Sequence, residues 1–261
     1  MDSSIFQLLA KVEQRHWWFV ARRRIMRRML QELLPPDGKS LVVDVGCGTG
    51  ANIASLKDDY ECVGIDTSED AIRFARQRFE HVQFIQGLAP QALGELAERM
   101  DAFLMMDVLE HVENDRELLG HQLAVLKPGG YALLTVPADM RLWSEHDVNL
   151  GHYRRYDIDS FRTLWDGLPV EELLISHFNT RLYPVVRAVR FLSKLRGRAW
   201  GRAGTDMSVP WGPVNRCLES LFAGEMKRLI SLLKSRRSRG YTFGVSLMAI
   251  LKKQHWDKVA V

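Results

Sequence analysis

The chain has 261 residues, of which 46% are hydrophobic and 26% are charged. This composition is that of an ordinary globular protein with a core large enough to fold unaided, and it excludes a low-complexity chain. Lysine and arginine exceed aspartate and glutamate by only 36 to 32, so the formal charge of +4 does not by itself indicate an anionic partner.

Cysteine use and hydropathy set two further limits. The three cysteines, Cys47, Cys62 and Cys217, have neither C-x-x-C pairing nor metal-ligand spacing, so neither a disulfide framework nor a metal site is expected. The longest apolar stretch, Tyr241–Leu251, is far shorter than the ~20 residues that span a bilayer, and the amino terminus is acidic and polar. We therefore expect a cytoplasmic protein.

The amino-terminal segment, residues 3–34, predicts one or two helices interrupted at residues 16–19, where the sequence reads HWWF. Five arginines follow on the second helix: Arg22, Arg23, Arg24, Arg27 and Arg28. Pro35-Pro36-Asp37-Gly38 then breaks the helix.

From residue 41 the chain alternates short apolar runs with helical stretches, which is typical of βαβ units and a parallel sheet. The predicted strands are Leu41–Val45, Glu61–Ile65, Val82–Gln86, Ala102–Met106 and Tyr131–Val136. The predicted helices are Asn52–Lys57, Glu69–Phe79, Ala92–Arg99 and Arg116–Val125.

Beyond Pro137 an irregular stretch, WSEHDVNLGHYRRY, precedes a predicted helix over 158–165 and a sixth strand over 171–177. Residues 181–237 predict two or three basic amphipathic helices, and the run 241–251 predicts a closing strand, which in this architecture usually joins antiparallel. We thus expect an α/β fold with a seven-stranded doubly wound sheet. Its parts are a helical cap (1–37), a cofactor-binding core (38–180), a helical insertion (181–240) and a closing strand with a tail (241–261).

A glycine-rich loop follows the first predicted strand in VVDVGCGTGA, residues 42–51. Glycines at 46, 48 and 50 allow a tight turn and a close approach of backbone to ligand, and the next helix amino terminus favours an anionic group. Gly46, Gly48 and Ala51 also satisfy the dinucleotide fingerprint, and Asp66 lies twenty residues after Gly46. The loop therefore indicates a cofactor site without distinguishing between cofactors.

The surrounding pattern resembles class I S-adenosylmethionine-dependent methyltransferases. The matching features are Asp44 two residues before the first glycine, the acid Asp66 in VGIDTS, and the runs DAFLMMDVLEHV and VLKPGGYALLTVPA, which are similar to quinone-biosynthesis O-methyltransferases. Together these motifs cover roughly residues 41–137. The resemblance implies S-adenosylmethionine as the cofactor, and the seven-stranded methyltransferase sheet.

The resemblance also implies the cofactor-binding residues. Asp66 would hold the ribose hydroxyls, and Asp107 would lie beside the methionine part, although a helix-capping role for Asp107 stays open. The family commonly has Gly-Asp-Ala after the third strand, where this chain has Gly87-Leu88-Ala89, so backbone groups near Leu88 would have to meet the adenine. The full predicted set is Asp44, Gly46, Cys47, Gly48, Gly50, Asp66, Thr67, Leu88, Asp107 and Val108.

The predicted acceptor site follows the fifth strand, at the sheet edge where open α/β folds place ligands. Its pattern, LWSxHD then GHYRRY, resembles a bacterial branch whose members often accompany glycan or polyprenyl-lipid pathways, and in which the HWWF element recurs. The hypothesis makes His146 or His152 the general base and Asp147 the residue that orients it. The predicted acceptor-binding residues are Trp17, Trp18, His111, Tyr153, Arg154 and Arg155.

Two alternatives stay open at this site. The same residues could form a hydrogen-bonded scaffold that fixes the loop, and His111 could be a packed histidine at the site floor. A metal held by His146, Asp147 and His152 is disfavoured, because no second carboxylate set accompanies them.

The insertion carries arginines and lysines between apolar residues from Val185 to Arg202. Such a helix fits an anionic membrane surface. Equally, it fits a lid whose apolar face covers the active site while its charges are solvated.

Three competing functions remain. The LKPGG turn and Asp44 argue against a dehydrogenase. A nucleic-acid methyltransferase is disfavoured because base-amino enzymes typically carry Asn/Asp-Pro-Pro-aromatic where this chain has Asp107-Val108-Leu109-Glu110. A non-catalytic cofactor-binding scaffold is not excluded by the motifs. We expect methyl transfer to oxygen of a small-molecule or lipid- or glycan-linked acceptor.

Overall fold

The computed structural model describes residues 3–196, 205, 207–235 and 240–254. Its centre is a sheet of seven strands: β1 (Leu41–Val45), β2 (Glu61–Asp66), β3 (Gln83–Gln86), β4 (Ala102–Met106), β5 (Tyr131–Pro137), β6 (Val170–Phe178) and β7 (Ser246–Lys253). The strands lie in the order β3-β2-β1-β4-β5-β7-β6. Those from β3 to β5 pair in parallel, and β7 runs antiparallel to both β5 and β6. This confirms the predicted seven-stranded architecture and the antiparallel closing strand.

The central strands β1 and β4 are buried along their whole length because helices cover both faces of the sheet. All five residues of β1 and all five of β4 are buried. The helices are α1 (Ser3–Val12), α2 (Trp17–Leu33), α3 (Ala51–Ala54), α4 (Glu69–Arg78), α5 (Asp115–Val125), α6 (Glu145–Leu150), α7 (Ile158–Arg162), α8 (Tyr183–Arg196), α9 (Gly212–Ala223) and α10 (Met226–Ser235), with 3₁₀ turns η1 (Gln91–Arg99), η2 (Leu109–His111) and η3 (Met140–Leu142).

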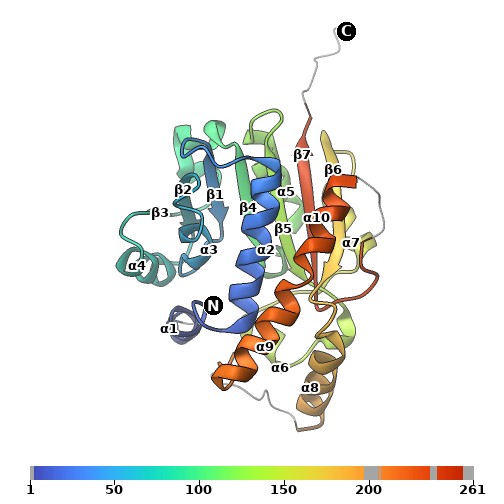
Figure 1. Ribbon diagram of the computed structural model, residues 1–261. Helices are drawn as coiled ribbons and strands as arrows, with labels where there is room; N and C mark the ends of the chain where they lie inside the picture. The colour runs from blue at the N-terminus through green and yellow to red at the C-terminus, as the bar shows by residue number, and fades with distance from the viewer. Residues whose placement is uncertain (1–2, 197–204, 206, 236–239, 255–261) are drawn as a thin grey trace.

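Two hydrophobic cores lie on opposite faces of the sheet (Figure 1). The helices α2, α3, α4, α9 and α10 pack on one face, where Ile25, Ile72 and Phe222 are fully or almost fully buried. The turn η1 and the helices α5 and α7 pack on the other face, where Leu119 and Phe161 are buried. The architecture is therefore doubly wound, as predicted.

The amino-terminal segment forms two helices, but the HWWF element is not the break between them. His16 is the N-cap of α2, its side chain accepting from the Trp18 N–H, so Trp17 and Trp18 already belong to the helix. The prediction placed the break too late, because it gave the aromatic residues more weight than the capping side chain.

Three other predicted elements differ from the structure. The helix expected over 52–57 is helical only over α3, and η1 is a 3₁₀ turn kinked at Gly94, where φ is 54°. The stretch expected to be irregular contains α6, which is stabilised at its start by a capping box between Ser144 and Asp147. Short helices of this kind lack the long apolar periodicity on which sequence prediction depends.

The predicted insertion contains α8, α9 and α10, and part of it (197–204, 206 and 236–239) lies outside the described residues. The closing strand begins at Ser246 rather than at residue 241. Tyr241 forms only an isolated bridge with His177. Within the described part of the chain, no helix is both long and apolar enough to cross a membrane.

Candidate active site

The loop after β1 carries the three glycines predicted to bind the cofactor. Gly46, Gly48 and Gly50 have φ angles of 73°, 53° and 89°, a region that favours glycine. A Cβ on Gly46 would lie 2.6 Å from a methyl carbon of Val108, so this loop packs directly on the segment after β4. A Cβ on Gly48 would meet nothing within 4 Å, so the backbone of this glycine faces open space.

This difference in packing predicts that alanine substitution at the two glycines lowers stability by different amounts. We expect Gly46→Ala to lower the free energy of unfolding by about 1–2 kcal/mol for its positive φ and by a further ~1–3 kcal/mol for the overlap with Val108. Gly48→Ala incurs only the first cost. Urea unfolding of both variants measures the difference, and equal stabilities would contradict the packing argument.

Asp66 ties the end of β2 to the glycine loop. Its Oδ2 accepts the N–H of Gly48 at 2.9 Å and its Oδ1 accepts the N–H of Ser68 at 2.9 Å. Burial nevertheless raises the pKa of this carboxyl group above its ordinary value. Thr67 is exposed next to it, whereas the thiol of Cys47 is buried, which raises its pKa well above the usual range and makes it unreactive.

Asp44 is fully buried in β1 below the loop. Neither of its carboxylate oxygens has a hydrogen-bond partner among the described residues. Burial raises the pKa of Asp44 to about 8, although the nearby charge of Arg22 opposes the shift. A buried carboxyl without a partner is costly, so its presence here points to a ligand.

Arg22 is a site residue that the sequence analysis did not single out. This guanidinium of α2 is buried, forms an ion pair with Asp107, and stacks 4.2 Å from the ring centre of Trp18. Burial lowers the pKa of Arg22 to about 10, with repulsion from Arg23 acting in the same direction. Its position in the sequence was the available signal, because Arg22 shares the buried face of α2 with Phe19, Ile25, Met26 and Met29 at helical spacing.

Asp107 directly follows β4 and has a φ of 58°. Its Oδ1 accepts the hydroxyl of Thr135 at 3.2 Å and its Oδ2 pairs with Arg22. Val108, not Asp107, is the N-cap of η2, and η2 has no side-chain cap. The structure therefore gives no support to the capping alternative and places this carboxylate between the glycine loop and α2.

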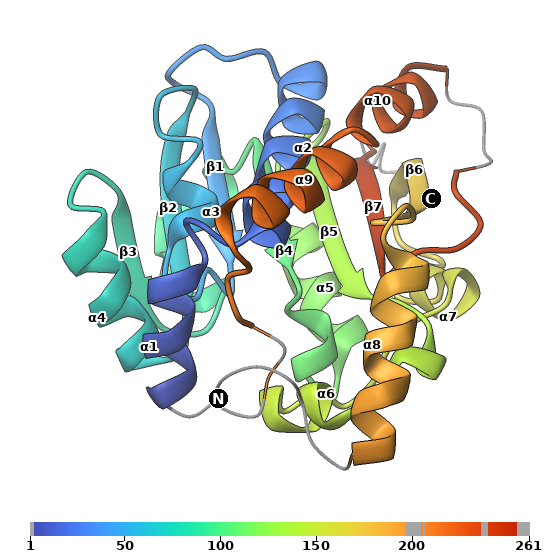
Figure 2. The ribbon, with the colours of Figure 1, turned by 60° about the horizontal axis from the view of Figure 1, so that its bottom comes forward.

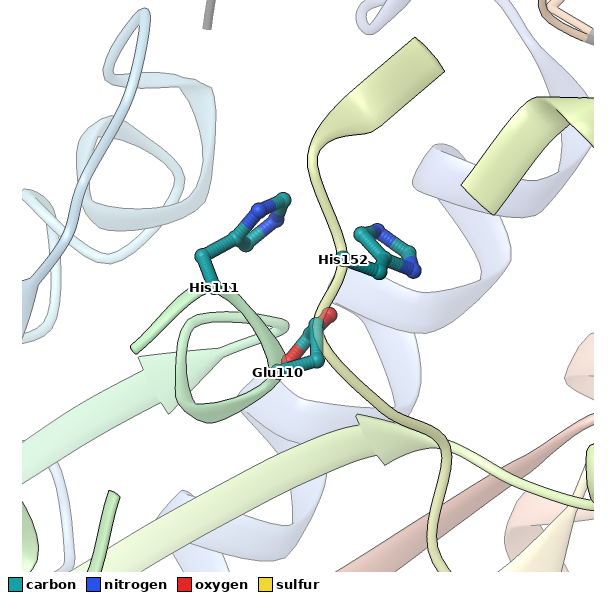
Figure 3. Close-up of side chains that lie close together, drawn as sticks. All are labelled: Glu110, His111 and His152. Atoms are coloured by element: carbon teal, nitrogen blue, oxygen red, sulfur yellow. The ribbon is translucent and has the colours of Figure 1, made fainter. Parts of the chain in front are cut away.

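Three side chains that could hold a metal or move a proton meet beyond Asp107. Glu110, His111 and His152 each present a ligand atom, and these atoms lie within 4.8 Å of one another (Figure 3). The rings of His111 and His152 meet edge to face, 4.7 Å between centres. Both Glu110 oxygens are buried without a hydrogen-bond partner among the described residues, and burial raises the pKa of Glu110 to about 8. Burial, with repulsion from His152, lowers the pKa of His111 to about 4.

Asp147 is the centre of a second, fully buried group. Its Oδ1 accepts His152 Nδ1 at 3.1 Å and Arg155 Nε at 2.8 Å, while its Oδ2 accepts the N–H of Ser144 at 2.9 Å and lies 3.4 Å from Arg190 Nη1. Burial disfavours the ionised carboxylate. The hydrogen bond from His152 and the charges of Arg155 and Arg190 outweigh this effect and hold the pKa of Asp147 well below its usual range.

Comparison with known proteins identifies the family. Residues 18–168, more than half of the chain, match the family model described as a methyltransferase domain. The chain belongs to this methyltransferase family.

Individual relatives agree with this assignment. The chain is 30% identical over 128 residues to a trans-aconitate 2-methyltransferase of Azoarcus sp. (48% of this chain, 50% of the relative). It is 30% identical over 129 residues to the mitochondrial ubiquinone biosynthesis O-methyltransferase of Saccharomyces cerevisiae (46% and 41%). The methyltransferase thus spans about half the length of the curated relatives it matches. A SAM-dependent methyltransferase from Archaeoglobus fulgidus shares its fold, with a TM-score of 0.53 at 18% identity over 88% of this chain and 94% of that one.

The cofactor of this family is S-adenosylmethionine, and the residues present fit it. The backbone at Gly48 is open, Asp66 stands at the end of β2, and Leu88 beyond β3 is 57% exposed. The unpartnered carboxyl of Asp44 lies below the loop. The glycine loop therefore offers the ligand an open backbone at Gly48, with the carboxyl groups of Asp44 and Asp66 next to the loop.

The remaining predicted acceptor-binding residues differ in their surroundings. The backbone N–H of Trp17 donates to Asn215 at 3.0 Å, and its partly buried ring packs edge to face on Phe222 of α9. Trp18 stacks on Arg22 and so borders the site. Tyr153 is exposed, and its N–H donates to the carbonyl of Glu110 at 2.8 Å.

The two arginines expected to meet an anionic acceptor already have anionic partners. Arg154 Nη1 pairs with Asp115 Oδ2 at 2.6 Å, and Arg155 is buried against Asp147. These contacts correspond to the scaffold alternative, in which the segment is fixed by its own hydrogen bonds. His152 of the GHYRRY element also presents a ring nitrogen close to Glu110 and His111.

His146 differs from His152. Its burial, with the charge of Arg190, holds the pKa of His146 well below the ordinary value for histidine. Such an imidazole is a weak base at neutral pH. His152 contacts Asp147 through Nδ1 at 3.1 Å and presents a ligand atom close to Glu110 and His111, so it is our candidate for the base.

Proposed function

We propose that this methyltransferase transfers the methyl group of S-adenosylmethionine to an oxygen atom of a small-molecule or lipid- or glycan-linked acceptor. The sulfonium supplies an activated methyl group for in-line displacement, so the protein has to align the acceptor, exclude water and remove a proton. The observation that carries the proposal is His152, held by Asp147 and facing Glu110 and His111 beside Asp107. The ubiquinone biosynthesis relative is named an O-methyltransferase, which supports oxygen.

In this proposal His152 is the general base. With Nδ1–H donating to Asp147, its Nε2 is the unprotonated nitrogen and accepts the hydroxyl proton of the acceptor. The buried negative charge of Asp147 stabilises the imidazolium that forms. His111, whose pKa is about 4, stays neutral and orients the acceptor by hydrogen bonding.

Glu110, His111 and His152 are also a ligand set that a divalent cation accepts. We favour proton transfer because the charges of Arg22 and Arg155 already act on Glu110, and a further cation would be repelled. We therefore expect turnover to be unchanged by EDTA.

The decisive variant is His152→Asn. An asparagine amide can still donate to Asp147 while the atom equivalent to Nε2 is lost. We expect kcat to fall by about 10²–10⁴ with little change in the affinity for S-adenosylhomocysteine. The matched control is His121→Asn on the exposed side of α5. The assay follows tritium from labelled S-adenosylmethionine into cell-extract fractions, and unchanged turnover would remove His152 from catalysis.

The helix α8 supports a lipid-linked acceptor. Its inward side contacts the segment after β5: Tyr183 bonds to Asp139, Arg190 to Ser144, and Lys194 Nζ to the carbonyl of Arg141 at 3.2 Å. This is the reverse of the predicted lid, because polar side chains face inward. The outward side chains are apolar and exposed: Val185, Val189, Phe191, Leu192 and Leu195.

An exposed apolar stripe on a helix with three exposed basic residues, Arg187, Lys194 and Arg196, and no acidic ones fits an anionic bilayer surface. Figure 2 shows α8 beside α6, at the end of the molecule that carries the loops after β5. A membrane at this face would present a lipid-linked acceptor next to the site.

Vesicle binding tests this orientation. We expect the methyltransferase to co-sediment with vesicles containing phosphatidylglycerol but not with pure phosphatidylcholine, and Phe191→Ser/Leu195→Ser to lose most of this binding. Leu88→Ser is a control of similar exposure beyond β3, at the opposite edge of the sheet. Absence of binding to anionic vesicles would contradict the membrane contact and leave a soluble acceptor.

The proposed function as a whole is tested by titrating the protein with S-adenosylmethionine, S-adenosylhomocysteine and NADH in parallel. We expect saturable binding of the two sulfur compounds alone. Binding of NADH alone would overturn the proposal, and binding of the sulfur compounds without transfer to any extract fraction would favour a non-catalytic scaffold.

A further inference from the structure

A cavity between α2, α3 and α4 has a lining that includes neither Asp107 nor His152. Its volume is about 600 Å³, a size typical of small-molecule sites. It is formed by the turn between α1 and α2, by the first half of α2, by α3 with the turn after it, and by the carboxyl end of α4 with the segment that follows it. Figure 1 shows these helices. Its lining comprises Gln14, Arg23, Ala51, Ala54, Ser55, Lys57, Gln77, Arg78, Phe79, Glu80, His81 and Val82.

The wall of this cavity is cationic. Arg23, Lys57 and Arg78 line it, against the single carboxylate of Glu80. Arg78 Nη1 is occupied, because it pairs with Glu13 and donates to the carbonyl of Thr49 at 3.1 Å. Glu13 is shared, since it also accepts the hydroxyl of Thr49 at 2.6 Å. The Glu13 carboxylate next to the cavity is therefore already paired with Arg78 and hydrogen-bonded to Thr49.

Two guanidinium nitrogens at this wall lack acceptors. Arg23 Nη1 and Arg78 Nη2 are buried, and neither has a hydrogen-bond partner among the described residues. Burial lowers the pKa of Arg23, and repulsion from the nearby Arg78 acts in the same direction, while the charge of Glu13 opposes the shift. Buried donors without acceptors and neighbouring like charges are both costly to the folded protein. An anion between them would remove both costs.

We propose that this cavity binds a phosphate-bearing small molecule. Arg23, Arg78 and Lys57 would hold the phosphate oxygens, since guanidinium groups match phosphate geometry. The buried side chains of Ala51, Ala54 and Val82 offer an apolar floor for the organic part. None of Asp107, Glu110 and His152 lines the cavity, so its ligand is an effector rather than the methyl acceptor. A lipid headgroup does not fit, because α8 follows β6 at the opposite edge of the sheet.

Calorimetric titration of the full chain with inorganic phosphate and pyrophosphate, at constant ionic strength, tests this site. We expect saturable binding of at least one of the two, one per chain, both with and without saturating S-adenosylhomocysteine. Binding that disappears in the presence of S-adenosylhomocysteine would place the anion on the glycine loop and overturn the proposal.

Variants locate the bound anion. We expect Arg23→Gln/Lys57→Gln to weaken binding at least tenfold, whereas Arg73→Gln/Arg99→Gln, which removes two exposed charges outside the cavity, leaves it unchanged. If the first double variant fails to fold, Lys57→Glu reverses a charge at an exposed position and is expected to have the same effect. No saturable binding of either anion, or equal affinity in cavity and control variants, would overturn the proposal.

Discussion

Asp44→Asn is expected to stabilise the ligand-free protein and to abolish its function. Asp44 is fully buried, its oxygens have no hydrogen-bond partner among the described residues, and its pKa is raised to about 8. In the unfolded chain the same carboxyl group ionises near pH 4, whereas in the folded protein it ionises only near pH 8. Ionisation therefore favours the unfolded chain progressively as pH rises from about 4 to about 8, and the free energy of unfolding falls over this window.

An asparagine does not titrate, so the advantage of the variant should grow with pH. At 1.36 kcal/mol per pKa unit it is about 1–2 kcal/mol at pH 5 and at most about 5 kcal/mol at pH 8, above which it levels off. Urea unfolding at pH 5 and pH 8 measures both values. Asp58→Asn is the control, because Asp58 is exposed and its replacement should leave the pH dependence unchanged. A pH-independent difference, or a less stable variant, would contradict this account.

The same variant should bind S-adenosylhomocysteine at least tenfold more weakly. The carboxyl group that has no partner within the described chain lies below the glycine loop, where a ligand would provide one. Stability and binding would thus change in opposite directions, which is the behaviour of a residue kept for function at a cost in stability. A variant that is more stable and binds as well as the parent would remove Asp44 from the site.

The part of the fold that sequence predicted best is the parallel half of the sheet. The strand at 102–106 was predicted with its observed bounds because five consecutive apolar residues between turn signals fit a strand buried on both faces. The prediction was weakest for short helices set by single side chains. The capping box of Ser144 and Asp147 starts a helix of six residues, too short to show an apolar period.

The glycine loop of the candidate site could be predicted because its geometry depends on the local chain. Gly46, Gly48 and Gly50 all adopt the positive φ that their residue type favours. The partners of the charged residues could not be predicted, since they depend on contacts between distant segments. Arg22 lies 85 positions from Asp107, and its ion pair forms only when α2 crosses the end of β4. For the same reason Arg154 and Arg155 were expected to meet an acceptor, although each has a carboxylate of its own.

Asp147→Ala is expected to cause the largest loss of stability among these variants. The carboxylate is buried between Arg155 and Arg190, so its removal leaves two buried guanidinium groups without their common anion. Removing one partner of a buried ion pair typically costs about 3–5 kcal/mol. Because contacts hold the pKa of Asp147 below its ordinary value, its stabilising effect is present above about pH 4 and is lost as the pH falls further.

Asp115→Ala is the matched control. Asp115 also accepts from an arginine and from Tyr156 Oη, but Arg154 is partly exposed and can be solvated once the carboxylate is gone. Replacing Asp115 should therefore lower the free energy of unfolding by less than replacing Asp147. Thermal and urea unfolding compare the two variants at pH 7, and the difference between them should shrink only as the pH falls well below about 4. Equal losses at pH 7 would contradict the buried-charge explanation.

A second substitution separates lost charge from lost packing. Arg190→Met removes one of the two guanidinium groups, so Asp147→Ala/Arg190→Met should be more stable than Asp147→Ala alone. Arg190 also connects α8 to Ser144 and to the carboxylate behind His152. Loss of Asp147 should therefore loosen α8 together with the proposed base, and limited proteolysis should cut α8 faster in Asp147→Ala than in Asp115→Ala. If α8 is cut at the same rate in both variants, the helix is held by its other contacts, and the coupling between the exposed face of α8 and His152 is absent.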